Sequence, residues 1–111
     1  MAGLINRQHA GTGAQVDVYT SPTAANGGKG TVVSSIVFVG TSTASATAAT
    51  ARVRIAPAGA ADAAVHEVFP ATPVGVGEHR SFTEGITLAP GDVLRVLATS
   101  GVNVHVYGTE L

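Results

Sequence analysis

A chain of 111 residues forms a single domain, and its 45% hydrophobic content is ordinary for a globular protein. Only 12% of its residues are charged, and 6 Lys and Arg against 7 Asp and Glu give a formal charge of −1, which excludes the basic surface of a nucleic-acid binder. Cysteine is absent, so disulfides, thiolate metal sites and thiol catalysis are excluded, and no apolar run approaches the ~20 residues of a membrane-spanning helix.

Alternation of apolar and polar residues predicts short β-strands along the chain, with no stripe at helical spacing. In chain order, the expected strands are 14–20, 31–40, 49–55, 64–69, 78–84, 93–99 and 102–108. Turn residues separate them, including the hairpin turn Ser100-Gly101 and the turn Pro90-Gly91-Asp92, whose Asp we expect to bond nearby backbone amides. The Thr- and Ser-rich stretch 41–50 predicts a polar hairpin loop, because its composition disfavours a helix.

These strands predict an all-β fold, an antiparallel β-sandwich of about seven to eight strands that is jelly-roll-like or Ig-like. Strand 31–40 is apolar on both faces, which is typical of a central strand covered on each side. Strand 102–108 places its valines on one face and Asn103, His105 and Tyr107 on the other. Tyr19 and Tyr107 are expected on polar faces, as candidate partner contacts. The expected core residues are Val33, Ile36, Phe38, Val53, Ile55, Leu88, Val93, Leu97, Val104 and Val106.

Side chains that could carry chemistry are few and scattered. The histidines fall on four different segments, at His9, His66, His79 and His105, and none follows another at the spacing of a metal site. No Gly-x-Ser-x-Gly nucleophile elbow is present. Paired carboxylates for glycoside hydrolysis could come from Glu67, Glu78 and Glu84, but no Trp is present to stack a sugar. We therefore expect a protein that is not an enzyme, with no catalytic residue, cofactor or metal.

The low charge favours a subunit of an assembly. A free monomer of this size exposes on the order of 5,500 Å², and so few charged side chains cover only a minority of that surface. A protein inside an assembly needs less charge for solubility than a free one. The alternative is a small stable domain whose surface is solvated by Thr and Ser.

Several segments resemble a known class of protein. The stretch 85–96, the turn Ser100-Gly101 and the end of the chain from Val104 to Leu111 are similar to the C-terminal half of small β-sandwich virion proteins of tailed bacteriophages. Val32-Val33-Ser34-Ser35-Ile36 matches their central strand, and Arg52-Val53-Arg54-Ile55 before Pro57-Ala58-Gly59 matches a later strand and turn. The resemblance covers residues 16–111. The chain departs from it in a longer turn at 26–30 and a shorter, Pro-rich connection at 70–77.

The resemblance implies a non-enzymatic structural component of a tailed-phage virion, in first place a capsid decoration (cement) protein on the shell of the major capsid protein. The alternatives are a tail- or fibre-associated virion protein and a free carbohydrate- or surface-binding β-sandwich module. The implied partners are the major capsid protein or other virion subunits, together with further copies of the chain as a homo-oligomer. No nucleic acid or membrane partner is expected. The implied location is the virion, after synthesis in the host cytoplasm.

Residues 1–13 are expected to form an extended N-terminal arm beside a single sandwich domain of residues 14–111. Apart from Met1, Leu4 and Ile5 the arm has little apolar content, so alone it cannot offset roughly 1–2 kcal/mol of backbone entropy per ordered residue. We expect it to lie against a neighbouring subunit, with Leu4 and Ile5 as the apolar anchor and Arg7 and His9 in polar contacts. Pairing along the edge of its own sandwich is the alternative.

Overall fold

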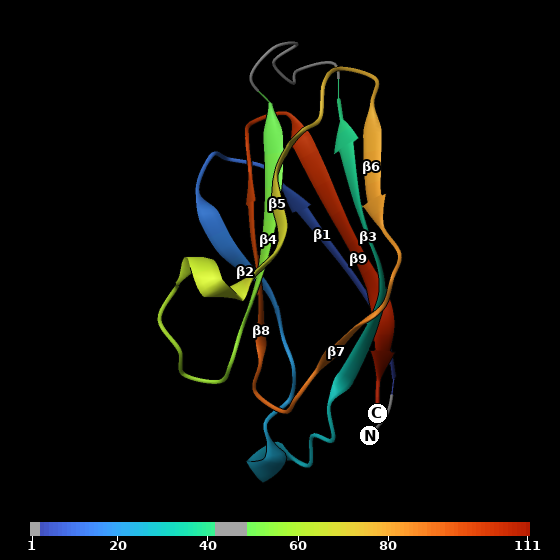
Figure 1. Cartoon of the computed structure of the whole chain (residues 1–111). Helices are drawn as coiled ribbons and strands as arrows, with labels where there is room; N and C mark the ends of the chain where they lie inside the picture. The colour runs from blue at the N-terminus through green and yellow to red at the C-terminus, as the bar shows by residue number, and fades with distance from the viewer. Residues whose placement is uncertain (1–2, 42–48) are drawn as a thin grey trace.

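The computed structural model describes residues 3–41 and 49–111, which form two antiparallel β-sheets packed face to face (Figure 1). Sheet A contains, in spatial order, β1 (Gly3–Ala10), β9 (Val102–Glu110) and β3 (Thr31–Gly40), followed by β6 (His79–Phe82) and β7 (Ile86–Leu88), which both pair with β3. Sheet B contains β2 (Gln15–Thr20), β8 (Val93–Ala98), β4 (Thr50–Ala56) and β5 (Glu67–Pro73). Two single-turn 3-10 helices, Ala24–Asn26 and Ala64–His66, lie in the connections.

The strand pairing is that of a jelly roll, in which a long hairpin of strands folds over on itself. β1 pairs with β9, β2 with β8, β3 with β6 and β7, and β4 with β5. β6 and β7 act as two pieces of one strand, because they pair with successive parts of β3. The all-β sandwich prediction is confirmed, and the pairing selects the jelly roll over the Ig-like alternative.

Each of the seven predicted strands corresponds to a strand of the structure, whereas β1 and β7 were not predicted. The strand expected at 64–69 starts later, at Glu67, because a 3-10 turn precedes it. The predicted turn at Pro90-Gly91-Asp92 is confirmed: Gly91 has a φ of 85°, and the Ala89 N–H donates to Asp92 Oδ2 at 3.0 Å. Most of the loop expected at 41–50 lies outside the described residues.

Residues 3–10 form an edge strand of sheet A, so the prediction of an extended arm is wrong. The whole segment pairs with β9, from Gly3 opposite Glu110 to Ala10 opposite Asn103. Backbone hydrogen bonds to β9 and the burial of Ile5, which is 5% exposed, order the segment within its own chain. The alternative, pairing along the edge of the same sandwich, is the arrangement that the structure has.

Inward-facing side chains of both sheets form one core, whose largest fully buried members include Phe38, Ile36 and Leu88. The core prediction is wrong for two residues of β8. Val93 and Leu97 are half-buried on the outer face of sheet B, and Leu94 and Val96 point inward instead. The segment is apolar at both parities, so periodicity could not choose between its faces. Of the other predicted residues, Ile55 is half-buried against the core and the rest are buried.

A polar cluster closes the side of the sandwich between the edge strands β1 and β2. Tyr19 is 4% exposed, and its hydroxyl donates to Glu110 Oε2 and lies 3.1 Å from Thr31 Oγ1. The Arg7 guanidinium lies over the Tyr19 ring, 5.6 Å from its centroid. The prediction that Tyr19 lies on a polar face is therefore wrong, because a register shift between Asp17 and Tyr19 turns the ring inward.

Ionisation of Tyr19 should destabilise the fold at high pH. Burial raises the pKa of Tyr19 above its usual value of 10.0, and the hydrogen bond to Glu110 raises it further. The folded state therefore holds this proton more tightly, so stability is complete below pH 10 and falls as the pH rises above it. We expect the free energy of unfolding, measured with urea from pH 8 to 11, to fall more steeply in the wild type than in Tyr19→Phe. Tyr107→Phe, at an exposed tyrosine, is the control that should keep the steep fall, and equal slopes in all three proteins would contradict the prediction.

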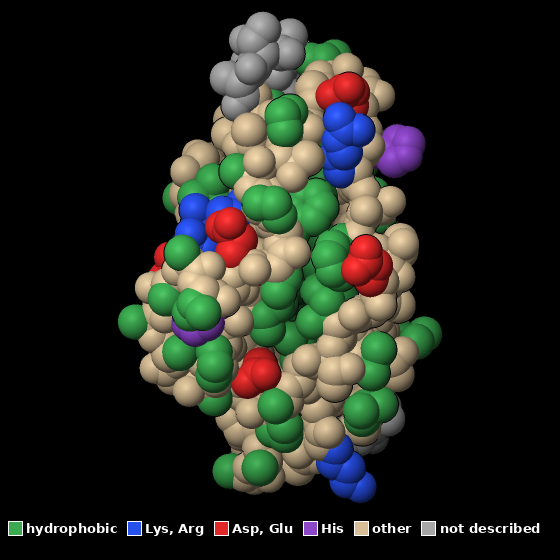
Figure 2. All heavy atoms as spheres, viewed as in Figure 1, with side chains coloured by type: hydrophobic (Ala, Val, Ile, Leu, Met, Phe, Trp, Pro, Cys, Tyr) green, Lys and Arg blue, Asp and Glu red, His purple; other side chains and the backbone are tan. Residues whose placement is uncertain are grey.

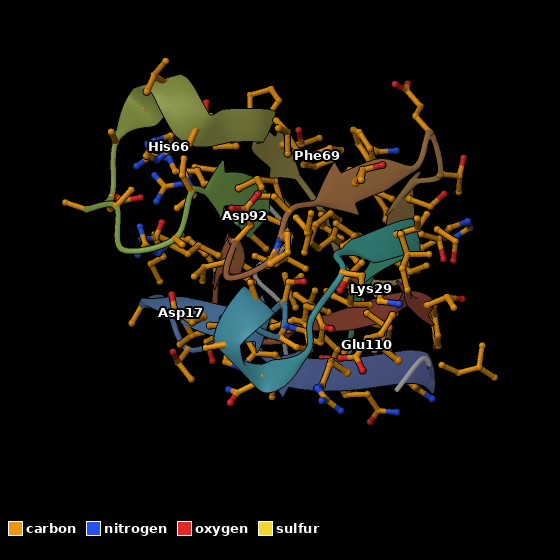
Figure 3. The ribbon with its side chains drawn as sticks, turned by 90° about the horizontal axis from the view of Figure 1, so that it is seen from below. Asp17, Lys29, His66, Phe69, Asp92 and Glu110 are labelled. Atoms are coloured by element: carbon orange, nitrogen blue, oxygen red, sulfur yellow. The ribbon has the colours of Figure 1, made fainter. Side chains whose placement is uncertain are left out.

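Aromatic side chains close the opposite side, between β5 and β6. The Phe38 and Phe69 ring centroids are 5.1 Å apart, and Phe69 meets Phe82 edge-on at 6.2 Å. Arg80 Nε also reaches across, donating to the Pro73 carbonyl at 3.3 Å. Figure 2 shows this side as a hollow lined by hydrophobic side chains, and Figure 3 shows Phe69 and Glu110 on opposite sides of the sandwich. The two open sides of the jelly roll are therefore sealed differently, one by a polar cluster and one by aromatic rings.

Candidate functional site

The residues predicted to contact a neighbouring subunit all lie on β1, but they do not share one face. Leu4 points outward and is 89% exposed, whereas Ile5 is part of the chain's own core. Arg7 is exposed along its strand but lies over the ring of Tyr19 in its own chain. His9 is half-buried and lines a small hollow described below. The structure therefore leaves Leu4, not Ile5, as the apolar side chain that a partner can reach.

Leu4 belongs to a broad surface that carries no charge. In a strand, alternate side chains point to opposite faces, so the register of sheet A identifies those that face outward. We call these residues the uncharged face: Leu4, Asn6, Gln8 and Ala10 of β1; Asn103, His105, Tyr107 and Thr109 of β9; Val32, Ser35, Val37 and Val39 of β3; His79 and Ser81 of β6; Thr87 of β7. Among these described outward-facing residues there is no Lys, Arg, Asp or Glu.

The centre of the uncharged face is apolar and aromatic. Val32, Val37 and Val39 of β3 are half-buried, and the described part of the chain places no third layer over them. Beside them on β9, the rings of His105 and Tyr107 are parallel, with centroids 6.4 Å apart and an interplanar angle of 5°. The prediction that strand 31–40 is covered on both faces is therefore met within the described residues on one face only.

A hollow of about 160 Å³ lies at the β1–β9 end of this face, lined by Gln8, His9, Ala10, Asn103, Val104 and His105. Nε2 of His9 and Nδ1 of His105 are buried, and neither has a hydrogen-bond partner within the described residues. Buried polar atoms are normally paired, so these two nitrogens are exceptions within the described residues. Within residues 3–41 and 49–111, no group of three or more His, Cys, Asp or Glu is placed to hold a metal ion.

Sheet B has the opposite character, because its outer face carries charges that pair with one another. The ion pairs are Arg54–Asp62 at 2.7 Å, Arg95–Asp17 at 3.1 Å, Arg54–Glu67 at 3.3 Å and Arg52–Glu67 at 3.8 Å. Arg95 also donates to the Ala60 carbonyl at 3.0 Å, which ties the 57–66 connection to the sheet. Figure 3 shows Asp17 and His66 on this side of the molecule. Desolvation raises the pKa of Asp62, but the hydrogen bond from Arg54 lowers it more strongly together with the nearby positive charges, so this pKa lies below its usual value.

The two outer faces therefore differ in what docking would cost. Burying a charged group against a partner carries a large desolvation penalty unless a new partner charge meets it. The uncharged face avoids this penalty, whereas sheet B would have to lose ion pairs or bury them.

No family model, curated protein or solved structure matches the chain. The described part of the chain also contains no helix with the length and hydropathy needed to cross a membrane.

The sequence identified part of this surface. The alternation of strand 102–108 placed Asn103, His105 and Tyr107 on one face, as found. It could not reveal the rest, because the face exists only once β9 lies between β1 and β3. The available signal was the row of apolar residues on the outer face of strand 31–40, which indicated that another surface covers this face.

Proposed function

We propose that this chain is a non-enzymatic structural subunit of a tailed-phage virion, which decorates the head by binding the shell of the major capsid protein through the uncharged face. The observation that carries the proposal is the uncovered row Val32, Val37 and Val39 at the centre of a sheet face without charged side chains. The centre of a protein interface is typically depleted in charge and enriched in aromatic residues, as this surface is around Tyr107. The resemblance of residues 16–111 to small virion proteins supplies the kind of assembly.

A small hollow adjoins this surface, where Gln8 and Ala10 of β1 meet Asn103 and His105 of β9. The free carbohydrate-binding alternative would use the same hollow, with Tyr107 beside it. The volume of the hollow, about 160 Å³, is below the roughly 300–1,000 Å³ of typical small-molecule sites. A protein partner that covers the whole face is therefore favoured over a sugar bound in the hollow.

The first test is the amount of the chain in particles. Virions whose genome encodes it are purified, and its ratio to the major capsid protein is measured by quantitative mass spectrometry. Head decoration predicts a large fixed copy number, comparable with that of the major capsid protein. A few copies per particle would point to the tail- or fibre-associated alternative, and absence from particles would overturn the virion proposal.

The second test places a positive charge on each sheet in turn. Thr109 lies exposed on the uncharged face, between Leu4 of β1 and Val32 of β3, and Thr20 lies exposed on the outer face of sheet B. We expect Thr109→Lys to weaken binding to particles lacking the chain by at least about tenfold, because the buried ammonium would be unpaired. Thr20→Lys is the matched control and should bind like the wild type. Equal binding by both variants, with unchanged circular dichroism, would exclude the uncharged face as the contact surface.

A further inference from the structure

The sandwich has four edges, and they differ in how well they are protected. An edge strand presents unpaired N–H and C=O groups that can pair with another chain, and proteins usually block them with prolines, bulges, lysines or short strands. The edges are β1 and the broken strand β6–β7 in sheet A, and β2 and β5 in sheet B.

Three of the four edges carry such a device. β5 contains Pro70 and Pro73 and has two register shifts against β4. β2 has a register shift between Asp17 and Tyr19. The β6–β7 edge is interrupted at residues 83–85, where Gly85 has a φ of 80°. By contrast, β1 has 8 residues in unbroken register, and within this described strand there is no Pro and no Lys; its one charged side chain, Arg7, lies over the Tyr19 ring.

The backbone groups that β1 leaves free can be assigned from its pairing. The Gly11 N–H donates to the Val102 carbonyl at 2.8 Å, in line with the register of β1 and β9. Hydrogen-bonded pairs alternate along an antiparallel ladder, so the odd-numbered residues of β1 bond to β9. The N–H and C=O groups of Leu4, Asn6, Gln8 and Ala10 therefore point to the open edge. These residues also contribute their side chains to the uncharged face, and the charged side chain of the strand, Arg7, lies at the opposite parity, over the Tyr19 ring.

We propose that two copies of this chain join through β1, as antiparallel strands related by a two-fold axis at Asn6. A two-fold contact is self-complementary, because each copy offers the other the same row of donors and acceptors. With the axis at Asn6, the Asn6 residues of the two copies form a hydrogen-bonded pair, and Leu4 of each copy forms one with Gln8 of the other. Ile5 of each copy then lies opposite Arg7 of the other. An axis at Arg7 would place two like charges directly opposite each other, which is destabilising, and an axis at Gln8 would shorten the overlap.

Joining the two edges also makes the two uncharged faces continuous across the dimer. A second copy is therefore favoured over a foreign strand, since it extends the same uncharged surface and, with the axis at Asn6, keeps the two Arg7 side chains from facing each other. This proposal concerns the isolated chain and does not rest on the virion function. A monomer would overturn it without affecting particle binding, and loss of particle binding would leave it intact.

The chain has no cysteine, so a single introduced thiol reports the contact directly. Partners in a hydrogen-bonded pair have Cα atoms about 5.5 Å apart, within the range that a disulfide spans. We expect Asn6→Cys to form a disulfide-linked dimer under mild oxidation. Ser81→Cys, exposed on the same face at the opposite edge of sheet A, is the matched control and should stay monomeric. Cross-linking of Ser81→Cys with equal efficiency would overturn the proposal.

A second measurement uses Asn6→Pro, which deletes an outward N–H without removing a hydrogen bond to β9. Light scattering over a concentration series should give twice the monomer mass for the wild type and the monomer mass for Asn6→Pro, with both proteins keeping their β-sheet circular dichroism. If Asn6→Pro unfolds, the cross-linking of Asn6→Cys still decides. A monomeric wild type, including one whose Asn6→Cys variant cross-links only to another virion protein, would show that β1 does not pair with itself.

Discussion

Replacing Phe38 by alanine should lower the free energy of unfolding by about 3–5 kcal/mol. The side chain is fully buried, and its ring packs on Phe69 of the opposite sheet at 5.1 Å, so truncation removes a contact between the sheets and leaves a cavity. Small domains have only about 5–15 kcal/mol of stability in total, so the loss is a large part of it. Urea denaturation followed by circular dichroism measures the change.

Phe82→Ala is the matched control for this result. Phe82 belongs to the same aromatic row but is only half-buried, so its truncation opens a site that water can fill and should cost clearly less. A loss at Phe38 below about 1 kcal/mol, or one no larger than at Phe82, would show that the ring is not a central part of the core.

Adding a single methyl group at Gly108 should be nearly as damaging. A Cβ built there would lie 2.3 Å from the Val32 carbonyl oxygen and 2.9 Å from Val33 Cα, so the backbone of β3 would have to move. The close approach arises where the pairing of β3 with β9 shifts register, between Val33 and Ser35. We expect Gly108→Ala to lower the free energy of unfolding by about 3 kcal/mol, at the upper end of the usual cost of overpacking.

Gly3→Ala provides the control at a second strand glycine. A Cβ at Gly3 would meet nothing within 4 Å, so this variant should change stability by less than about 0.5 kcal/mol in the same urea experiment. If Gly108→Ala were as stable as Gly3→Ala, the contact between β9 and β3 would have to be looser than the structure indicates.

Features encoded by a few neighbouring residues could be predicted from the sequence. The turn at Pro90-Gly91-Asp92 follows from the fixed φ of proline and the tolerance of glycine for positive φ, and the alternation of strand 102–108 fixes its two faces. The wholly apolar character of strand 31–40 placed Phe38 in the core. Each of these features depends on the conformational preferences and spacing of residues that are close together in the sequence.

Features that depend on distant partners could not be predicted. The strand character of residues 3–10 comes from pairing with β9 at the other end of the chain, so its weak local pattern suggested an arm. The inward turn of Tyr19 depends on a bulge against β8, and the choice of Leu94 over Val93 depends on which parity meets sheet A. The uncharged face likewise appears only when β1, β9 and β3 are side by side.

The order of strands also determines when the chain can fold during its synthesis. β9 lies between β1 and β3, and β8 lies between β2 and β4, so the earlier strands wait for central partners that are synthesised later. Contacts between residues so far apart in sequence make folding slow. Until residues 102–110 emerge from the exit tunnel, the edge of the apolar strand β3 that pairs with β9 has no partner. A nascent chain in this state is prone to aggregate. The interval before β9 emerges is therefore the period in which we expect the nascent chain to aggregate most readily.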